Sequence, residues 1–312
     1  MSVGVRPVVR KLQNWDAKAS VRVKPRRMLL DEEAIGRVYF SPELVPIAQH
    51  PEVVALGPEA VRAMQVQHLY RYLDFTTQLE LEVVNSACRD IALGKIRAAF
   101  PDVMREDAFK LCTDEAHHAY FSDDMKRQVA GATGIRPAEL ETPRFLERLR
   151  ALQDELPIGL RPMAELLFTV VSETLISSIL CQIPKDKRVV SAVRHIVADH
   201  AEDEGRHSAY FAQLFGYLWP QLSAYEQALL GPQLPHYVLA FLSPDHAAIR
   251  RSLESLPLER PAIERIIGQT YPTPKVLASA RAAALVTIRL FEYHGLMDKH
   301  QFRDEFSRLR LL

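Results

Sequence analysis

The motif Asp-Glu-x-x-His occurs twice in the chain, at residues 114–118 and 203–207. On an α-helix, side chains three residues apart lie on the same face, so each copy can direct one carboxylate and one imidazole at the same cation. Two such pairs on two helices, with one carboxylate from each of two further helices, form the dimetal site of some helical bundles. The repeat therefore predicts a carboxylate-bridged site for two metal ions.

This arrangement requires one inward-facing carboxylate on the helix before each pair. Before the first pair, the helical neighbours of Glu80 form an apolar stripe of Leu73, Thr76, Val83, Val84 and Ala87. Glu82 lies roughly 200° around the helix from Glu80, so only one of them can face the site, and we expect Glu80 because its stripe is the more apolar. Before the second pair, Glu173 is the sole acid in residues 166–176. A buried carboxylate there is most simply explained as a metal ligand.

His200 breaks the symmetry of the two halves. It precedes Glu204 by four residues and His207 by seven, so the three side chains project within roughly 60° of one another on one helix face. We therefore predict seven ligands, four glutamates and three histidines. They are Glu80, Glu115, His118, Glu173, His200, Glu204 and His207.

The aspartates of the two motifs have a separate expected role. A metal-bound imidazole usually donates its other N–H to a carboxylate. Asp114 and Asp203 point away from the ligand face and suit that role, with Arg206 to balance their charge. The alternative is that both are ordinary exposed acids of a helix surface.

The ligand types favour iron, with manganese next, because carboxylates and imidazoles without thiolates suit these metals better than copper or structural zinc. Cys88, Cys112 and Cys181 form no Cys-x-x-Cys motif, which argues against a zinc-finger or iron–sulfur site and is typical of a reducing compartment. Four carboxylates neutralise two divalent ions and leave positions open for O₂. The expected chemistry is oxygen activation.

Few glycines, and prolines at the ends of long periodic segments, indicate an all-α protein. The expected helices cover residues 58–100, 103–130, 136–155, 159–183, 187–222, 262–268 and 274–294. No extended linker divides them. We predict a basic N-terminal arm at residues 1–30 and a single helical domain at residues 31–312, in which additional helices pack outside a four-helix core.

The chain has no net charge, since 39 basic residues balance 39 acidic ones. No global field therefore favours nucleic acid or an anionic membrane. The most apolar stretch, residues 166–181, is shorter than the roughly 20 residues of a membrane span, and the N-terminus lacks the apolar segment of a secretory signal, so we expect a cytoplasmic protein. Residues 6–27 are the local exception, with eight basic side chains, and the sequence predicts a solvated arm.

The combined pattern resembles that of the di-iron arylamine N-oxygenases, a family of the ferritin-like superfamily. It consists of Thr-Thr-x-Leu-Glu at 76–80, Asp-Glu-Ala-x-His at 114–118, Ser-Glu at 172–173 and His-x-x-x-Glu-x-x-His at 200–207. The resemblance runs from about Tyr72 into the last long helix and is weakest in the N-terminal arm and after about Leu222. It implies a ferritin-like bundle with the same seven residues as ligands of two iron ions.

For function, the resemblance implies a diferrous centre that binds O₂ to give a peroxo-diferric intermediate. That species would oxygenate an amine nitrogen, typically of an arylamine, through hydroxylamine and nitroso levels and in the best-known members to a nitro group, as in natural product biosynthesis. Tyr72 and an arginine on the last long helix, Arg281 or Arg289, would hold an acidic substrate, although both arginines are equally explained as surface residues. Since no nucleotide or flavin motif is evident, an external donor would supply the electrons. A homodimer is compatible with the long outer segments.

Other functions use similar motifs. A ferroxidase or iron-storage protein would leave His200 unexplained, and the chain is far longer than one four-helix subunit. A radical-generating oxidase would resemble the ribonucleotide reductase small subunit, which has a tyrosine where this chain has Ser122; we expect Tyr120 and Tyr210 to be core aromatics. A hydroxylating oxidase of the same superfamily is a further alternative. A purely structural bundle would require seven independent coincidences of buried polar residues.

Overall fold

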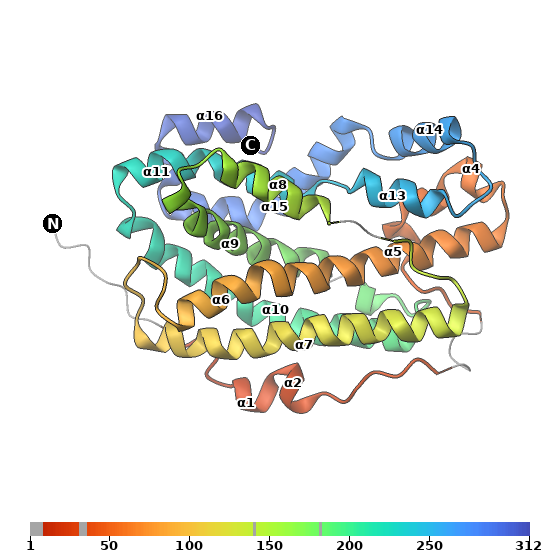
Figure 1. Cartoon of the computed structure of the whole chain (residues 1–312), viewed down its shortest axis with the longest axis horizontal. Coiled ribbons are helices and arrows are strands. Elements are labelled where there is room, and N and C mark those ends of the chain that lie inside the picture. Colours follow the sequence, from red (N-terminus) through yellow and green to blue (C-terminus); the bar gives the residue numbers. More distant parts are fainter. Residues whose placement is uncertain (1–8, 31–35, 140–141, 181–182) are drawn as a thin grey trace.

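Four long helical segments form the centre of the computed structural model (Figure 1), which describes residues 9–30, 36–139, 142–180 and 183–312. The first segment runs through three successive elements, and the others are single helices. The bounds are α5 (Pro58–Leu79), η3 (Glu80–Val84) and α6 (Asn85–Ala92), followed by α7 (Asp102–Thr133), α9 (Arg161–Leu180) and α10 (Ser191–Leu218).

These segments pack as a closed bundle. The α5–α6 segment packs on α7, α7 on α10, α10 on α9, and α9 against α6. Leu69, Leu111, Val171 and Phe211, one from each segment, are fully buried between them. The predicted all-α class is confirmed: within the described ranges the only strand-like pairing is an isolated bridge between residues 38 and 189.

Proline and glycine set several helix ends, and they explain why two predicted helices were too long. Pro58 occupies the first turn of α5, where its missing N–H costs no helical bond. The helix expected at 58–100 ends at Ala92, because Gly94 with φ of 66° turns the chain away. The helix expected at 136–155 begins only at Arg144, because Pro143 before it is extended, with ψ of 140°.

The element η3 is a single turn of π-helix that continues α5 into α6. Such turns within α-helices are frequent at functional sites. Its first residue, Glu80, is fully buried, whereas Glu82 is exposed. The π turn therefore presents Glu80, and not Glu82, to the inside of the bundle.

Further helices, most of them short, cover the side of the bundle formed by α9 and α5, in the upper half of Figure 1. They are α4 (Pro51–Val54), α8 (Arg144–Asp154), α11 (Ala224–Leu230), α12 (Leu234–Leu242), α13 (His246–Leu253), α14 (Arg260–Thr270), α15 (Thr273–Tyr293) and α16 (His300–Arg308). α8, α12 and α15 pack on α9, and α13 packs on α5. These contacts place a layer of helices outside the core, as predicted.

The N-terminal strap, defined here as residues 9–30, lies against the opposite side, below α7 in Figure 1. It contains α1 (Trp15–Lys18) and α2 (Ser20–Val23), and α2 contacts both α7 and α10. Leu12, Ala19 and Ser20 are fully or almost fully buried. The predicted solvated arm is therefore wrong for this segment, because its apolar residues and cations have partners on the bundle. Arg6 of the basic stretch lies outside the described residues, as does Cys181, and the domain boundary at residue 30 stays a prediction.

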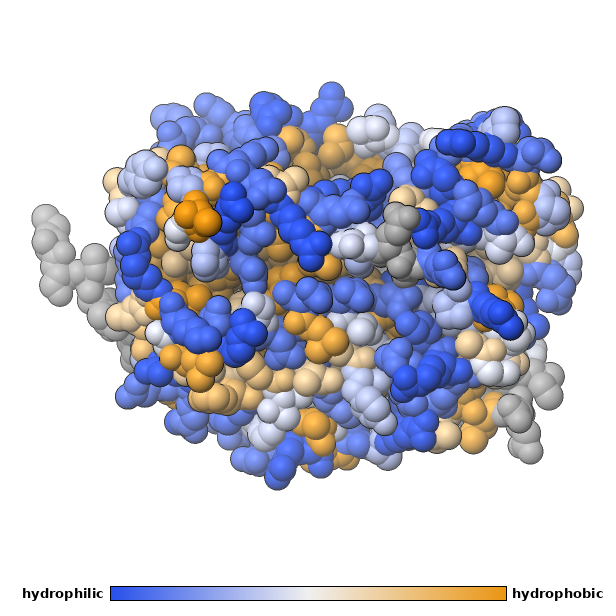
Figure 2. Space-filling view, viewed as in Figure 1, coloured by the Kyte–Doolittle hydropathy of each residue, from blue (hydrophilic) through white to orange (hydrophobic). Residues whose placement is uncertain are grey.

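On the face shown in Figure 2, hydrophobic groups lie scattered among hydrophilic ones. None of the described helices is both long and apolar enough to span a membrane.

Candidate metal centre

The four core segments bring all seven predicted ligands together inside the bundle. η3 carries Glu80, α7 carries Glu115 and His118, α9 carries Glu173, and α10 carries His200, Glu204 and His207. Every one of these side chains is 0–1% exposed. The spacing of three or four residues on α7 and α10 is what turns each helical set to a single face.

The donor atoms of these residues form three overlapping groups. In each group, one donor atom per residue lies within 4.8 Å of the others. The groups are Glu80, His118, His200 and Glu204; Glu115, His118, Glu204 and His207; and Glu80, Glu115 and Glu173. Because His200 and His207 belong to different groups that share His118 and Glu204, the arrangement suits two adjacent cations bridged by carboxylate.

One oxygen, Glu204 Oε1, is the point on which the three imidazoles converge. It lies 3.1 Å from His200 Nε2, 3.3 Å from His207 Nδ1 and 3.4 Å from His118 Nδ1. The two oxygens of Glu115 lie 2.9 Å from His207 Nδ1 and 2.8 Å from His118 Nδ1. Glu204 and Glu115 therefore lie at the centre of the cluster, each within 3.4 Å of two or more imidazole nitrogens.

The hydrogen bonding of the cluster is incomplete without a cation. Among the described residues, both carboxylate oxygens of Glu80 and of Glu173 accept no hydrogen bond, although they are fully buried. His200 Nε2 and His207 Nδ1 lie 3.1 and 2.9 Å from carboxylate oxygens, but within the described part of the chain neither makes a contact with hydrogen-bond geometry. Buried polar atoms without a partner cost free energy, and metal coordination would satisfy these. The donor set thus fits two metal ions.

Proton affinities lead to the same conclusion. Burial raises the pKa of Glu80 and of Glu173 well above the ordinary value, and neighbouring carboxylates raise it further. Burial alone would lower the pKa of His118 and of His207, but the surrounding carboxylates outweigh it and hold each pKa well above normal. Without metal, these glutamates and histidines therefore hold protons more tightly than usual, and metal binding would displace those protons.

The outer nitrogens of the histidines are paired with the two motif aspartates in a crossed pattern. His118 Nε2 on α7 lies 3.1 Å from Asp203 Oδ2 on α10, and His207 Nε2 on α10 lies 3.2 Å from Asp114 Oδ2 on α7. These bonds leave Nδ1 of each ring facing the cluster. Both aspartates are fully buried, and Arg206 forms an ion pair with Asp203. The aspartates are therefore not exposed helix acids.

The third histidine has a tyrosine as its outer partner. Tyr72 Oη lies 3.4 Å from His200 Nδ1, so His200 faces the cluster with Nε2. Burial raises the pKa of Tyr72, and the charges of Glu204 and Glu80 raise it further. Tyr72 is thus held as a neutral phenol that contacts His200 and also lines a neighbouring space.

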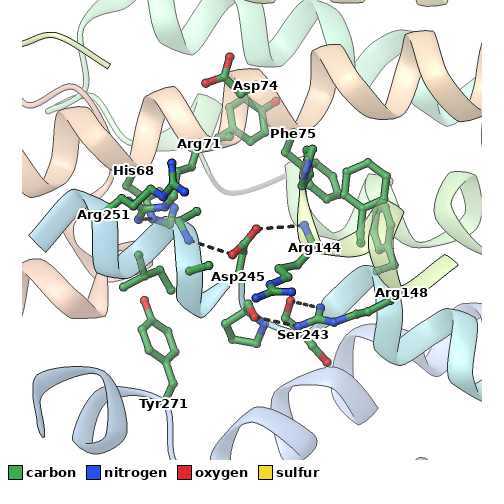
Figure 3. A pocket seen from close by; sticks show the side chains of 18 of the residues that line it. His68, Arg71, Asp74, Phe75, Arg144, Arg148, Ser243, Asp245, Arg251 and Tyr271 are labelled. Carbon is green, nitrogen blue, oxygen red and sulfur yellow. Dashed lines mark hydrogen bonds between the residues drawn. The ribbon is translucent and has the colours of Figure 1, made fainter. Parts of the chain in front are cut away.

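That space is a cavity of about 430 Å³ between α5, α8, α12 and α13. Its aromatic wall consists of Tyr72, Phe75, Phe145, Phe241 and Tyr271, and its arginines are Arg71, Arg144, Arg148 and Arg251. Figure 3 shows Arg71 and Arg251 on one side and Arg144 and Arg148 on the other. A cavity with aromatic walls and cations suits a flat organic anion.

Two of these arginines make no ion pair with any described carboxylate. Arg71 donates to Ser252 Oγ at 2.6 Å and to His68 Nδ1 at 3.0 Å. Arg148 donates only to backbone carbonyls among the described residues. Burial lowers the pKa of Arg71 to about 10, so it stays charged at neutral pH. Both guanidinium groups can therefore donate hydrogen bonds to an acidic group of a ligand.

Arg281 and Arg289 are not brought to this cavity. Both are exposed on α15, whose buried face is formed instead by Ala284, Thr287 and Ile288. Neither lines the cavity. The structure thus does not bring the arginine expected on the last long helix to this cavity, because the helix turns its small and apolar residues inward, and a substrate role for Arg281 or Arg289 stays a prediction.

Sequence reasoning missed Arg71, the π turn and the strap contacts to the aspartates. Trp15 gave a usable signal, because a tryptophan is unusual in a solvated basic arm. Tyr120 was expected in the core but is 56% exposed. Tyr210 is buried and donates to the Met104 carbonyl at 2.9 Å. The position expected for a radical tyrosine is Ser122, which is buried.

Fold and site together define a helical-bundle protein with a buried Glu/His cluster suited to two metal ions. The model of the p-aminobenzoate N-oxygenase AurF family matches residues 15–291. The chain belongs to this family of N-oxygenases, which are oxidoreductases. It is also 22% identical over 277 residues to the 4-aminobenzoate N-oxygenase of Streptomyces thioluteus, covering 87% of this chain and 81% of that relative.

Proposed function

We propose that the protein is an O₂-dependent N-oxygenase whose centre holds two iron ions and whose substrate is an amine that carries an acidic group. The observation that carries the proposal is the closed set of four glutamates and three histidines, with unpaired buried oxygens, in a chain of the N-oxygenase family. The ligands would be Glu80, Glu115, His118, Glu173, His200, Glu204 and His207. Iron is the preferred metal because no thiolate is present and oxygen chemistry requires a redox-active ion.

Bound iron would supply the redox chemistry with O₂. The first oxygenation balances as amine plus O₂, two electrons and two protons giving hydroxylamine plus water, and an external donor supplies the electrons. The protein would position the metals and the substrate and exclude water. Asp114 and Asp203 hold His207 and His118 with Nδ1 toward the cluster. Tyr72 holds its proton beside His200.

The substrate would bind in the cavity, its aromatic ring among the phenylalanines and its acidic group on Arg71. Arg71 fits this role because it is charged, enclosed and not ion-paired with any described acid. Tyr72 lines the cavity and contacts His200, so the amine end would point toward Tyr72. The relative from Streptomyces is named for 4-aminobenzoate, an amine of this class.

The test is anaerobic loading with Fe(II), followed by ¹⁸O₂, a reductant and a panel of arylamines with and without a carboxylate. We expect about two irons per chain and one ¹⁸O atom in the first product. The proposal would be contradicted if the assembled protein took up hundreds of irons per particle, or if it oxidised none of the amines in the panel.

Arg71→Gln tests the substrate site. It should raise the KM for carboxylated amines about 10- to 100-fold, because a charge-assisted bidentate contact is lost, with little change for neutral amines. Arg281→Gln, on the exposed face of α15, is the matched control and should leave the KM unchanged for carboxylated and for neutral amines. Equal effects of Arg71→Gln on acidic and neutral amines would remove Arg71 from the site.

A further inference from the structure

The N-terminal strap is linked to the Glu/His cluster through one aspartate on each motif helix. The indole N–H of Trp15 in α1 donates to Oδ1 and Oδ2 of Asp114, at 2.9 Å each. Asp114 in turn accepts from His207 Nε2. A continuous chain of hydrogen bonds therefore leads from Trp15 to a predicted metal ligand.

A second chain of hydrogen bonds starts five residues later. The backbone N–H of Ser20, at the start of α2, lies 3.3 and 3.2 Å from the two oxygens of Asp203, which accepts from His118 Nε2. Ser20 Oγ donates separately to the carbonyl of Asp199 at 3.1 Å. The strap thus gives each motif aspartate one donor.

Ion pairs fix the strap on both motif helices. On α7, Arg10 pairs with Glu106 and Arg26 with Asp124, at 2.8 and 2.7 Å. On α10, Lys24 pairs with Glu202 and Arg27 with Asp199, at 2.9 and 2.7 Å. These pairs account for Arg10, Lys24, Arg26 and Arg27 of the basic strap, and they connect it to both helices that carry the Asp-Glu-x-x-His motifs.

We propose that the strap is a positioning element of the metal centre: Trp15 and the Ser20 N–H hold Asp114 and Asp203, and through them fix the ring angle and tautomer of His207 and His118. This inference rests on the proposed dimetal site. Asp114 and Asp203 are fully buried, so a lost donor is not replaced by water at no cost. Loss of such a partner of a metal-bound histidine typically weakens metal binding 10- to 100-fold.

The two contacts should affect the two ions unequally. His207 belongs only to the donor group with Glu115, whereas His118 belongs to both groups that contain a histidine. Trp15→Phe should therefore weaken binding of one ion about tenfold or more and leave the other unchanged. Loss of the Ser20 N–H should weaken both. A contact that only stabilised the fold would not separate the ions in this way.

The experiment titrates metal-free protein anaerobically with Co(II), followed by its visible absorption, and in parallel with Fe(II). Trp15→Phe keeps an aromatic ring and removes the donor; Trp219→Phe, a buried tryptophan in η6 (Trp219–Gln221), is its control. Ser20→Pro removes the N–H at the first helical position, where proline is tolerated. Ser20→Ala keeps the N–H, loses the same hydroxyl and is the matched control.

Wild type, Trp219→Phe and Ser20→Ala should bind two Co(II) per chain with the same affinities and spectrum. Trp15→Phe should show one weakened ion and a changed ligand-field band. Wild-type affinities in Trp15→Phe would overturn the inference, as would equal affinities in Ser20→Pro and Ser20→Ala. Fewer than two Co(II) in wild type would instead contradict the dimetal site itself. Trp15→Phe decides the question if Ser20→Pro does not fold.

Discussion

The polar residues at the centre of this protein form two layers. The inner layer consists of glutamate oxygens and imidazole nitrogens that face one another, and the outer layer consists of Asp114, Asp203 and Tyr72, each of which contacts the far nitrogen of one imidazole. The outer contacts select which nitrogen faces inward: Nδ1 for His118 and His207, Nε2 for His200. This selection matters because a neutral imidazole can ligate a metal only through its unprotonated nitrogen.

Glu80→Gln and Glu82→Gln form a matched pair that tests the ligand assignment. Glu80→Gln should lose one of two ions or weaken it at least tenfold, because an amide is a poorer ligand than a carboxylate and leaves a charge uncompensated. Glu82→Gln changes an exposed side chain two residues away and should bind both ions normally. Metal content after gel filtration and Fe(II) titration measure both. Two ions at wild-type affinity in Glu80→Gln would show that another group takes its place.

The residues that the sequence could place are those that share a helix. The two motifs, His200 and the apolar stripe around Glu80 are local patterns, and the fold brings all of them to one cluster. The crossed pairing of Asp114 with His207, the role of Trp15 and the cavity position of Arg71 depend on contacts between distant segments. One sequence without its fold contains no local signal for such contacts.

At the scale of elements, the π turn η3 determines which side chains of the first core segment face inward. It lies between α5, which contributes Tyr72, and α6, which packs on α7 and α9. A single π turn adds one residue to an α-helix, so it shifts by one position the sequence pattern of everything after it. The period of 3.6 residues that predicts the rest of the segment does not reveal this turn.

Deletion of the exposed residue Leu81 tests the register. The deletion should convert η3 to α-helix. Five residues of π-helix turn through nearly the same angle as four of α-helix, so α5 and α6 should keep their packing. The change should fall on the turn itself, where Glu80 would leave its position. We expect loss of one ion, with helix content by circular dichroism within a few per cent of wild type. Leu81→Ala keeps the register and should bind two ions. Two tightly bound ions in the deletion variant would show that the π turn is dispensable.

An ion-pair cluster attaches α16 to α12 and should make this attachment acid-sensitive. Hydrogen bonding to Arg308 is the main cause that lowers the pKa of Glu305 to about 2; burial opposes it, and His236, 2.7 Å away, assists. Since the unfolded value is about 4.3, Glu305 stabilises the fold above about pH 5, and this contribution disappears as pH falls toward 2. Solvent screening reduces it to about 1 kcal/mol.

Glu305→Gln should therefore lower the free energy of unfolding by about 1 kcal/mol at pH 7 and leave it unchanged near pH 2, where Glu305 is itself protonated in the unfolded chain. Urea unfolding at several pH values measures the difference. Asp304→Asn, on the exposed face of the same helix, is the control and should have little effect at either pH. A difference that stays constant from pH 7 to pH 2.5 would mean that packing, and not charge, accounts for it.

At the scale of the whole molecule, two opposite sides of the bundle contribute to the proposed metal centre. The strap covers α7 and α10 and contacts Asp114 and Asp203, while the outer helices cover α5 and α9 and enclose the cavity. The basic strap was expected in solvent because most of its charges have no acidic partner nearby in sequence; Asp16, which pairs with Arg22, is the one acid within residues 9–30. The acidic partners on the motif helices are on average more than a hundred residues away from the strap in sequence, so these ion pairs can be identified only from the structure.

The proposed centre also couples metal binding to the stability of the whole fold. Ions that bind only the folded chain add roughly 2.7 kcal/mol each at a free concentration of 100 times Kd. With an unfolding entropy of roughly 0.65 kcal/mol/K for a chain of this size, chelation should lower Tm by roughly 4 °C for each ion lost, and re-addition of Fe(II) under anaerobic conditions should restore it. Glu80→Gln, expected to hold one ion, should show about half this decrease in Tm.

The metal-free protein should remain folded, because protons on Glu80 and Glu173 relieve the repulsion among buried carboxylates. Identical melting of the loaded and chelated protein would show that the glutamates and histidines are satisfied without metal, and the structural bundle would then be the better account.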